Sequence, residues 1–130
     1  MTFYLANGLV SGIILAAFLA LCDGLFFTST FQVLIDVSYF PGLAGLPSIV
    51  ELLIHLGISV AVASCYYFFY PPNARGMGKY LLFWVLLLSM LYLPLSYLSG
   101  QPLSIGGFLI WAIGHLLYIL FLTFQAERFR

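Results

Sequence analysis

The sequence predicts an all-α integral membrane protein: a four-helix transmembrane bundle with a short interfacial helix between spans 1 and 2. Two observations predict this class. Of the 130 residues, 64% are hydrophobic and only 6% are Asp, Glu, Lys or Arg, whereas a soluble domain carries about 25% charged residues. Four apolar segments also approach the length of about 20 residues that a transmembrane helix needs. We therefore expect residues 1–130 to form a single transmembrane domain.

The predicted spans are separated by residues that end helices. The first span covers roughly residues 3–27, and the second covers roughly 49–70, where a Pro-Pro pair stops the helix. The third covers roughly 80–98, with a proline near its end, and the fourth covers roughly 104–125, after a Gly-Gln-Pro turn. These boundaries leave only one long connection, between the first and second spans.

That connection, residues 28–48, contains the predicted interfacial helix. Ser29 or Thr30 provides an N-cap, and the segment ends in two turns rich in Pro and Gly. Apolar residues at helical spacing predict a helix that lies near the membrane surface. They are Phe31, Leu34, Ile35 and Tyr39.

The basic residues predict the orientation, because Lys and Arg of short connections are retained on the cytoplasmic side. With four spans, the connection between spans 2 and 3 lies on the same side as the C-terminus. We therefore predict a multi-pass protein of the inner (cytoplasmic) membrane, N-in and C-in, with three of its four acids facing outward. The basic residues are Arg75, Lys79, Arg128 and Arg130, and the outward acids are Asp23, Asp36 and Glu51.

Small residues predict how the helices pack, because close backbone approach drives association in lipid. One stripe runs along the first span, and a shorter one runs along the second. The third span is rich in leucine, with Ser89 as its main polar residue, and is expected to face lipid. A homo-oligomer through the Gly8, Gly12 and Ala16 face is the alternative to packing within the chain. The stripes are Gly8, Gly12, Ala16, Ala20 and Gly24, and Gly57, Ala61 and Cys65.

Ionisable residues in the spans define the candidate site, because a charge at membrane depth is costly and needs a reason. His55 and His115 lie on parallel spans at depths that differ by only about 7 Å, so they meet if those helices touch. Glu51 precedes His55 by four residues and is expected to orient its imidazole. Asp23, near the outer end of the first span, is a further candidate. We predict a His/carboxylate site in the outer half of the bilayer that binds or modifies a lipid or another apolar molecule.

Other interpretations of the same residues stay open. Each histidine is equally well explained as a neutral imidazole hydrogen-bonded within the bundle. No cofactor is predicted, although two axial imidazoles would suffice for haem, so a haem- or quinone-binding protein is one alternative. An oligomeric small transporter or a non-catalytic assembly partner is another. Membrane lipids are the expected partners; two histidines without a further ligand spacing do not predict a metal site, and the zero net charge gives no reason to expect nucleic-acid binding.

Three short segments carry a family resemblance: NGLVSG in the first span, IHLGIS around His55 and IGHLLY around His115. With its four spans, the chain resembles small bacterial inner-membrane proteins of the YagU-like kind. The resemblance implies a four-span inner-membrane protein. It implies no catalytic residue, substrate or cofactor.

Overall fold

The computed structural model describes residues 2–128, so the predicted cytoplasmic residue Arg130 lies outside the described part. All regular structure in that part is helical, which confirms the all-α class. Four helical segments are long and apolar enough to cross a membrane: α1, α3, α4 together with α5, and α6. The elements are α1 (Thr2–Phe26), α2 (Thr30–Ile35), α3 (Ser48–Phe68), η1 (Ala74–Gly76), α4 (Met77–Met90), α5 (Tyr92–Ser99) and α6 (Ile105–Arg128).

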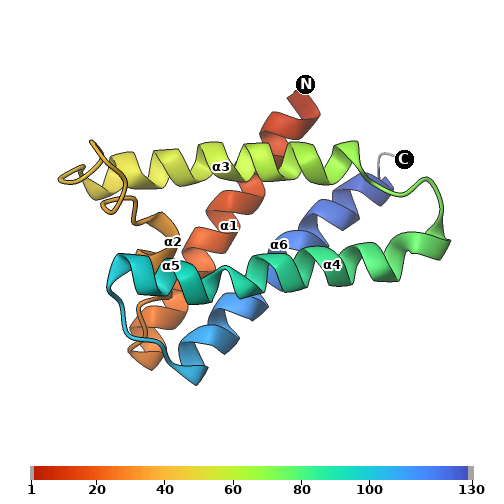
Figure 1. Cartoon of the computed structure of the whole chain (residues 1–130). Helices are drawn as coiled ribbons and strands as arrows, with labels where there is room; N and C mark the ends of the chain where they lie inside the picture. Colours follow the sequence, from red (N-terminus) through yellow and green to blue (C-terminus); the bar gives the residue numbers. More distant parts are fainter. Residues whose placement is uncertain (1, 129–130) are drawn as a thin grey trace.

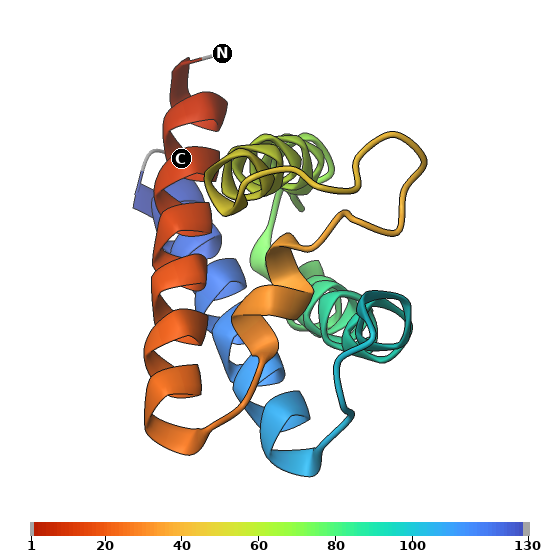
Figure 2. The same ribbon diagram turned by 90° about the vertical axis from the view of Figure 1, so that its left-hand side faces the viewer.

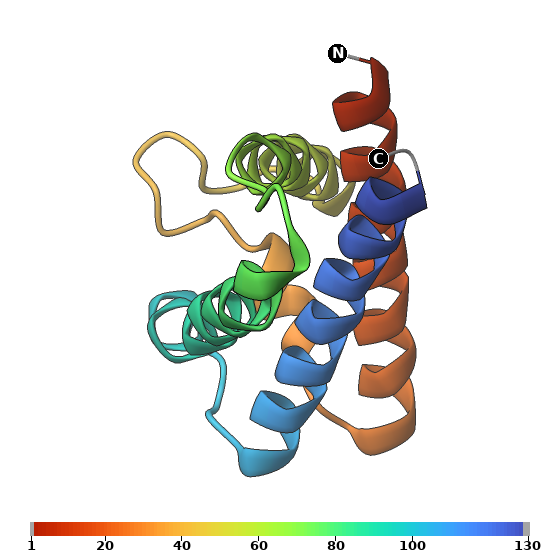
Figure 3. The same ribbon diagram turned by 90° about the vertical axis from the view of Figure 1, so that its right-hand side faces the viewer.

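The helices form two crossed pairs. Figure 1 shows α3 and α4 running in opposite directions across the view, with the steeper α1 and α6 behind them. In Figures 2 and 3, α3 and α4 are seen nearly end-on while α1 and α6 run along the page. α1 packs against α3 and α6, and α4 packs against α6. This arrangement leaves room between α3 and the α4–α5 segment.

The short helix α2 lies in that room. It packs against α1, α3, α5 and α6, and Figure 2 shows it between α3 and α5. Thr30, Val33 and Ile35 are buried. α2 therefore begins within the expected segment and is shorter than predicted. Because it contacts four other helices, its side chains Val33 and Ile35 are covered by protein, and Phe31 and Leu34 are partly covered.

The glycine stripe of α1 packs against α3 at its N-terminal half only. A β-carbon on Gly8 would lie 2.6 Å from Cα of Val60, and one on Gly12 would lie 2.6 Å from Oγ of Ser59. Only glycine permits this approach. Ala20 and Gly24 are exposed, so the expectation that the whole stripe is covered is wrong there. A homo-oligomer through the Gly8 face stays a prediction, and it would require α3 to separate from α1.

The predicted small-residue stripe of α3 is also wrong. Gly57, Ala61 and Cys65 are exposed, and a β-carbon on Gly57 would contact nothing within 4 Å. The buried face of α3 is instead polar and aromatic, since the close approach of α1 is provided by the glycines of α1. Its buried residues are Glu51, His55, Ser59, Ala63 and Tyr66.

The third span has an inward face and a break. α4 ends at Met90 and α5 begins at Tyr92. Pro94 lies just beyond the break; it has no backbone N–H, so it cannot donate to the carbonyl of Met90. The expectation that this span faces lipid is wrong for one side of it. That buried side consists of Leu88, Ser89, Tyr92 and Ser96.

Candidate functional site

A cavity of about 230 Å³ lies where α3, α6 and the α4–α5 break face the segment that follows α2. We call it the histidine cavity, because both histidines of the chain line it. Most of its wall is apolar. The lining residues are Leu15, Leu34, Asp36, Val37, Tyr39, Phe40, His55, Ile58, Ser59, Val62, Leu88, Leu91, Leu95, Trp111, His115 and Tyr118.

His55 enters the cavity from the buried face of α3. Its side chain is only 8% exposed, and its ring interacts with the backbone of Gly12 on α1. Its Nε2 is buried and has no hydrogen-bond partner. Buried polar atoms in proteins are nearly always paired, so this nitrogen calls for an explanation.

His115 enters the cavity from α6. Its Nδ1 lies 2.8 Å from the carbonyl oxygen of Trp111, one helical turn earlier. The Trp111 ring packs on the imidazole with centroids 4.5 Å apart, and its indole N–H donates to the carbonyl of Leu88 at 2.9 Å. These contacts hold the ring of His115 in place. The two imidazoles are close enough to interact electrostatically, so the structure brings the two predicted histidines together.

Hydroxyl groups join α6 to α3 beside the histidines. Tyr118 donates a 2.9 Å hydrogen bond to the carbonyl of Ser59. The Ser59 hydroxyl donates to the carbonyl of Gly8 on α1 at 2.7 Å and lies 3.1 Å from the Tyr118 hydroxyl. Three helices are therefore held together at the wall of the cavity.

Asp36 is the carboxylate on the cavity wall, and the sequence analysis did not select it. It ends α2 as the C-cap residue, is only 6% exposed, and accepts a 2.9 Å hydrogen bond from the N–H of Ser38. Burial, and then the nearby charge of Asp36, raise the pKa of Tyr39. An acid at a helix C-terminus is electrostatically unfavourable, but the helical spacing in the sequence continued to Tyr39, so the sequence did not show that Asp36 ends the helix.

Glu51 does not orient His55. One of its carboxylate oxygens accepts a 3.1 Å hydrogen bond from the N–H of Val37. No hydrogen bond joins it to His55 in the described part of the chain, and it is not among the residues that line the cavity. Its contact instead fastens the segment after α2 to the first turn of α3, where an acid is favourable.

Asp23 lies away from the cavity and caps α2. Its Oδ1 accepts hydrogen bonds from the N–H and the hydroxyl of Thr30, at 3.0 and 2.6 Å, and from the hydroxyl of Thr28. Its Oδ2 accepts from the N–H of Phe31 at 2.7 Å. Ser29, the expected N-cap, makes no side-chain cap bond. Asp23 is thus a structural residue of the α1–α2 turn.

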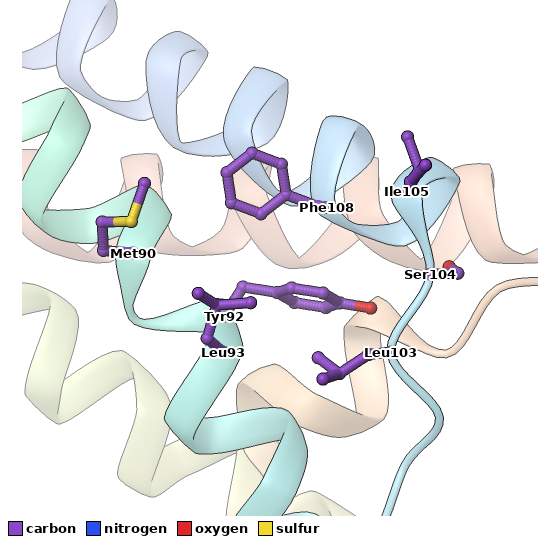
Figure 4. Close-up of a pocket in the computed structure, with 7 residues that line it drawn as sticks. All are labelled: Met90, Tyr92, Leu93, Leu103, Ser104, Ile105 and Phe108. Carbon is purple, nitrogen blue, oxygen red and sulfur yellow. The ribbon is translucent and has the colours of Figure 1, made fainter.

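A second cavity, of about 430 Å³, lies between α5 and the start of α6 (Figure 4). Met90, Leu93, Leu103, Ile105 and Phe108 give it an apolar lining, to which Tyr92 and Ser104 add hydroxyl groups. It contains no histidine or carboxylate. Within residues 2–128 no group of three or more His, Cys, Asp or Glu side chains is placed to hold a metal ion. The histidine cavity is therefore the candidate functional site.

Comparison with known proteins does not assign this site. No protein-family model, curated protein or solved structure matches the chain significantly. The YagU-like resemblance stays a prediction.

Proposed function

We propose that this protein binds an amphiphilic small molecule from the membrane in the histidine cavity, with the polar end of that molecule at His55 and His115. The observation that carries the proposal is a cavity lined by both His55 and His115, together with the buried Nε2 of His55, which has no hydrogen-bond partner. An unpaired buried polar group costs about 1 to 3 kcal/mol. A bound polar head would remove that cost.

The lining supports an amphiphile. Ligand pockets are typically apolar with a few placed polar groups, which describes a wall of leucine, isoleucine, valine and aromatic side chains around two imidazoles and Asp36. Its volume of about 230 Å³ is below the range of about 300–1,000 Å³ common for pockets that enclose a drug-sized ligand. The small polar head of an amphiphile, with part of its alkyl chain, fits this volume better than the macrocycle of haem does.

The membrane setting gives such a molecule a way in. We propose that the protein lies in the inner membrane with both termini cytoplasmic, as the distribution of basic residues predicts. The cavity then borders the outward connection through Tyr39 and Phe40, and the α4–α5 break through Leu91. A molecule dissolved in the outer leaflet can reach it without crossing the bundle.

The alternatives are less well supported. A haem protein would use both Nε2 atoms as axial ligands, but the small cavity volume speaks against a macrocycle between them. A transporter would need a polar path beyond the cavity, and the inner ends of the spans instead hold a tyrosine-rich aromatic cluster around Tyr66 and Tyr80. Binding without transport is therefore our preferred function.

Trp111 offers a direct test, because it lines the cavity and is one of only two tryptophans in the chain. With Trp84→Phe as background, brominated dodecyl amphiphiles with different heads are titrated into the protein in nanodiscs. We expect at least one of them to quench Trp111 saturably and to be displaced by its unlabelled form. Linear quenching by all of them, without displacement, would contradict the proposed function.

A further inference from the structure

Both histidines line the cavity, and the tautomer of one of them is defined by its hydrogen bond. A carbonyl only accepts, so the His115 contact with the Trp111 carbonyl places the proton on Nδ1. In the neutral ring of His115, Nε2 is then the bare nitrogen, and a partner for it must bring its own proton. The Nε2 of His55 is buried and has no hydrogen-bond partner.

The other polar side chains of the lining add few donors. The hydroxyl of Tyr118 donates to Ser59, the hydroxyl of Ser59 donates to Gly8, and the indole of Trp111 donates to Leu88. Each of these groups has a single proton to give. Apart from the histidines, the half-buried hydroxyl of Tyr39 is the one side-chain donor left among the lining residues.

The cavity is also lined by an acidic residue and by no basic one. Asp36 is buried, and one of its oxygens accepts from Ser38. No Lys or Arg is among the lining residues, and the three cationic side chains in the described part, Arg75, Lys79 and Arg128, lie in the α3–α4 connection, early in α4 and at the end of α6. A buried carboxylate is stable as an ion only when it is paired.

We propose that the head of the bound amphiphile is a protonated primary amine, an inference that rests on the proposed function. An alkylammonium group has three N–H donors and no acceptor. Among the lining residues, Nε2 of His115 and the carboxylate of Asp36 can accept from it, and His55, whose Nε2 has no partner, lines the same cavity. The aromatic face of Trp111 adds a further attraction for a cation.

The same chemistry disfavours other heads. A fatty-acid carboxylate brings acceptors and a negative charge to a wall that has an acidic residue and no basic one. A quinone brings carbonyl acceptors only. A trimethylammonium head has the charge without an N–H, and an alcohol has a donor without the charge. The trimethylammonium and alcohol compounds therefore separate the contribution of the charge to the affinity from that of the hydrogen bonds.

The test is the Trp111 quenching assay at pH 7 with four brominated dodecyl chains of identical length: amine, trimethylammonium, alcohol and carboxylate. A primary amine is charged at this pH, because its ordinary pKa is about 10.4. We expect the amine to bind at least about tenfold more tightly than each of the other three, the effect of one hydrogen bond to a charged group. Asp36→Asn keeps an acceptor for Ser38, and it should reduce amine affinity to near that of the alcohol.

Each outcome is decisive. Glu127→Gln is the matched control, because it removes an acid at the end of α6 that does not line the cavity. It should leave the order of affinities of the four compounds unchanged. Saturable binding in which the carboxylate, the alcohol or the trimethylammonium compound equals the amine would overturn the ammonium assignment while leaving the proposed function standing. Absence of saturable binding by all four would overturn both.

Discussion

Tyr118 donates a 2.9 Å hydrogen bond to the backbone carbonyl of Ser59, which ties α6 to α3 at the wall of the histidine cavity. Ser59 in turn donates to the carbonyl of Gly8 on α1. His55 lies one turn before Ser59, and His115 lies one turn before Tyr118. These bonds therefore fix the relative position of the two helices that carry the imidazoles, and their loss should affect both stability and binding.

Replacing Tyr118 with Phe should lower the free energy of unfolding by about 0.5 to 1.5 kcal/mol, the usual net contribution of one hydrogen bond. The measurement is reversible unfolding in mixed micelles. Tyr97→Phe is the control, because Tyr97 is 82% exposed and should change little. Equal stability of the two variants would mean that the Tyr118 bond does not hold α6 against α3.

Gly12→Ala should destabilise the protein, whereas Gly57→Ala should not. A β-carbon on Gly12 would lie 2.6 Å from Oγ and 2.8 Å from Cβ of Ser59, while one on Gly57 would meet nothing within 4 Å. Overpacking of this kind costs about 1 to 3 kcal/mol. The same unfolding assay compares the two. A larger loss for Gly57→Ala would reverse the assignment of the packed faces.

Much of this fold is predictable from the sequence, because length and hydropathy decide which segments enter a bilayer. The four spans follow from that, and the helical spacing of the apolar residues after Thr28 predicts the short helix. Which face of a span is buried does not follow. Small residues mark a packing face only where a partner approaches, and α1 supplies the glycines for its contact with α3, so Gly57, Ala61 and Cys65 of α3 remain exposed.

The site was predictable in part. His55 and His115 stand out as ionisable residues in apolar helices, and they share one cavity. The acids were harder to assign. Helical spacing pairs Glu51 with His55, but Glu51 instead accepts a hydrogen bond from the N–H of Val37, in the segment after α2. The acid that lines the cavity is Asp36, one residue before Val37. Spacing along one helix carries no information about how a loop folds back on it.

Asp23→Ala should release α2 without removing any group from the cavity. Four donors lose their acceptor, two of them backbone N–H groups at the start of α2, and loss of a cap alone costs about 0.5 to 2 kcal/mol. Hydrogen exchange of residues 28–36 should become faster. Asp23→Asn keeps one acceptor oxygen, so its exchange rates should lie between those of Asp23→Ala and those of the wild type. Unchanged exchange would show that α2 is held by its packing alone.

The predicted orientation is tested by cysteine labelling in cells. With Cys22 and Cys65 replaced by alanine, a cysteine at Asn73 should react only with reagents that reach the cytoplasm, and one at Ala44 should react with membrane-impermeant reagents added outside. Both positions are exposed. The physical reason is the retention of Arg75 and Lys79, which flank the α3–α4 connection, on the cytoplasmic side. Labelling from the opposite sides would show that the protein has the reverse orientation in the membrane.

The last prediction separates a binding role of His55 from a purely structural one. Nε2 of His55 is buried without a partner, so His55→Phe removes an unpaired polar atom, and it also removes the contact of the ring with the Gly12 backbone. These two effects oppose each other, so the free energy of unfolding of the ligand-free protein should change by no more than about 1 kcal/mol.

His115→Phe is the matched comparison, because it also removes a ring nitrogen but breaks the 2.8 Å bond to the Trp111 carbonyl. That variant should gain no stability. Both should lose saturable Trp111 quenching by the brominated amine. A protein keeps a destabilising buried group where function needs it, so a His55→Phe protein that keeps its stability but no longer binds would identify this imidazole as a binding residue. A destabilised variant that still binds would make it a structural one.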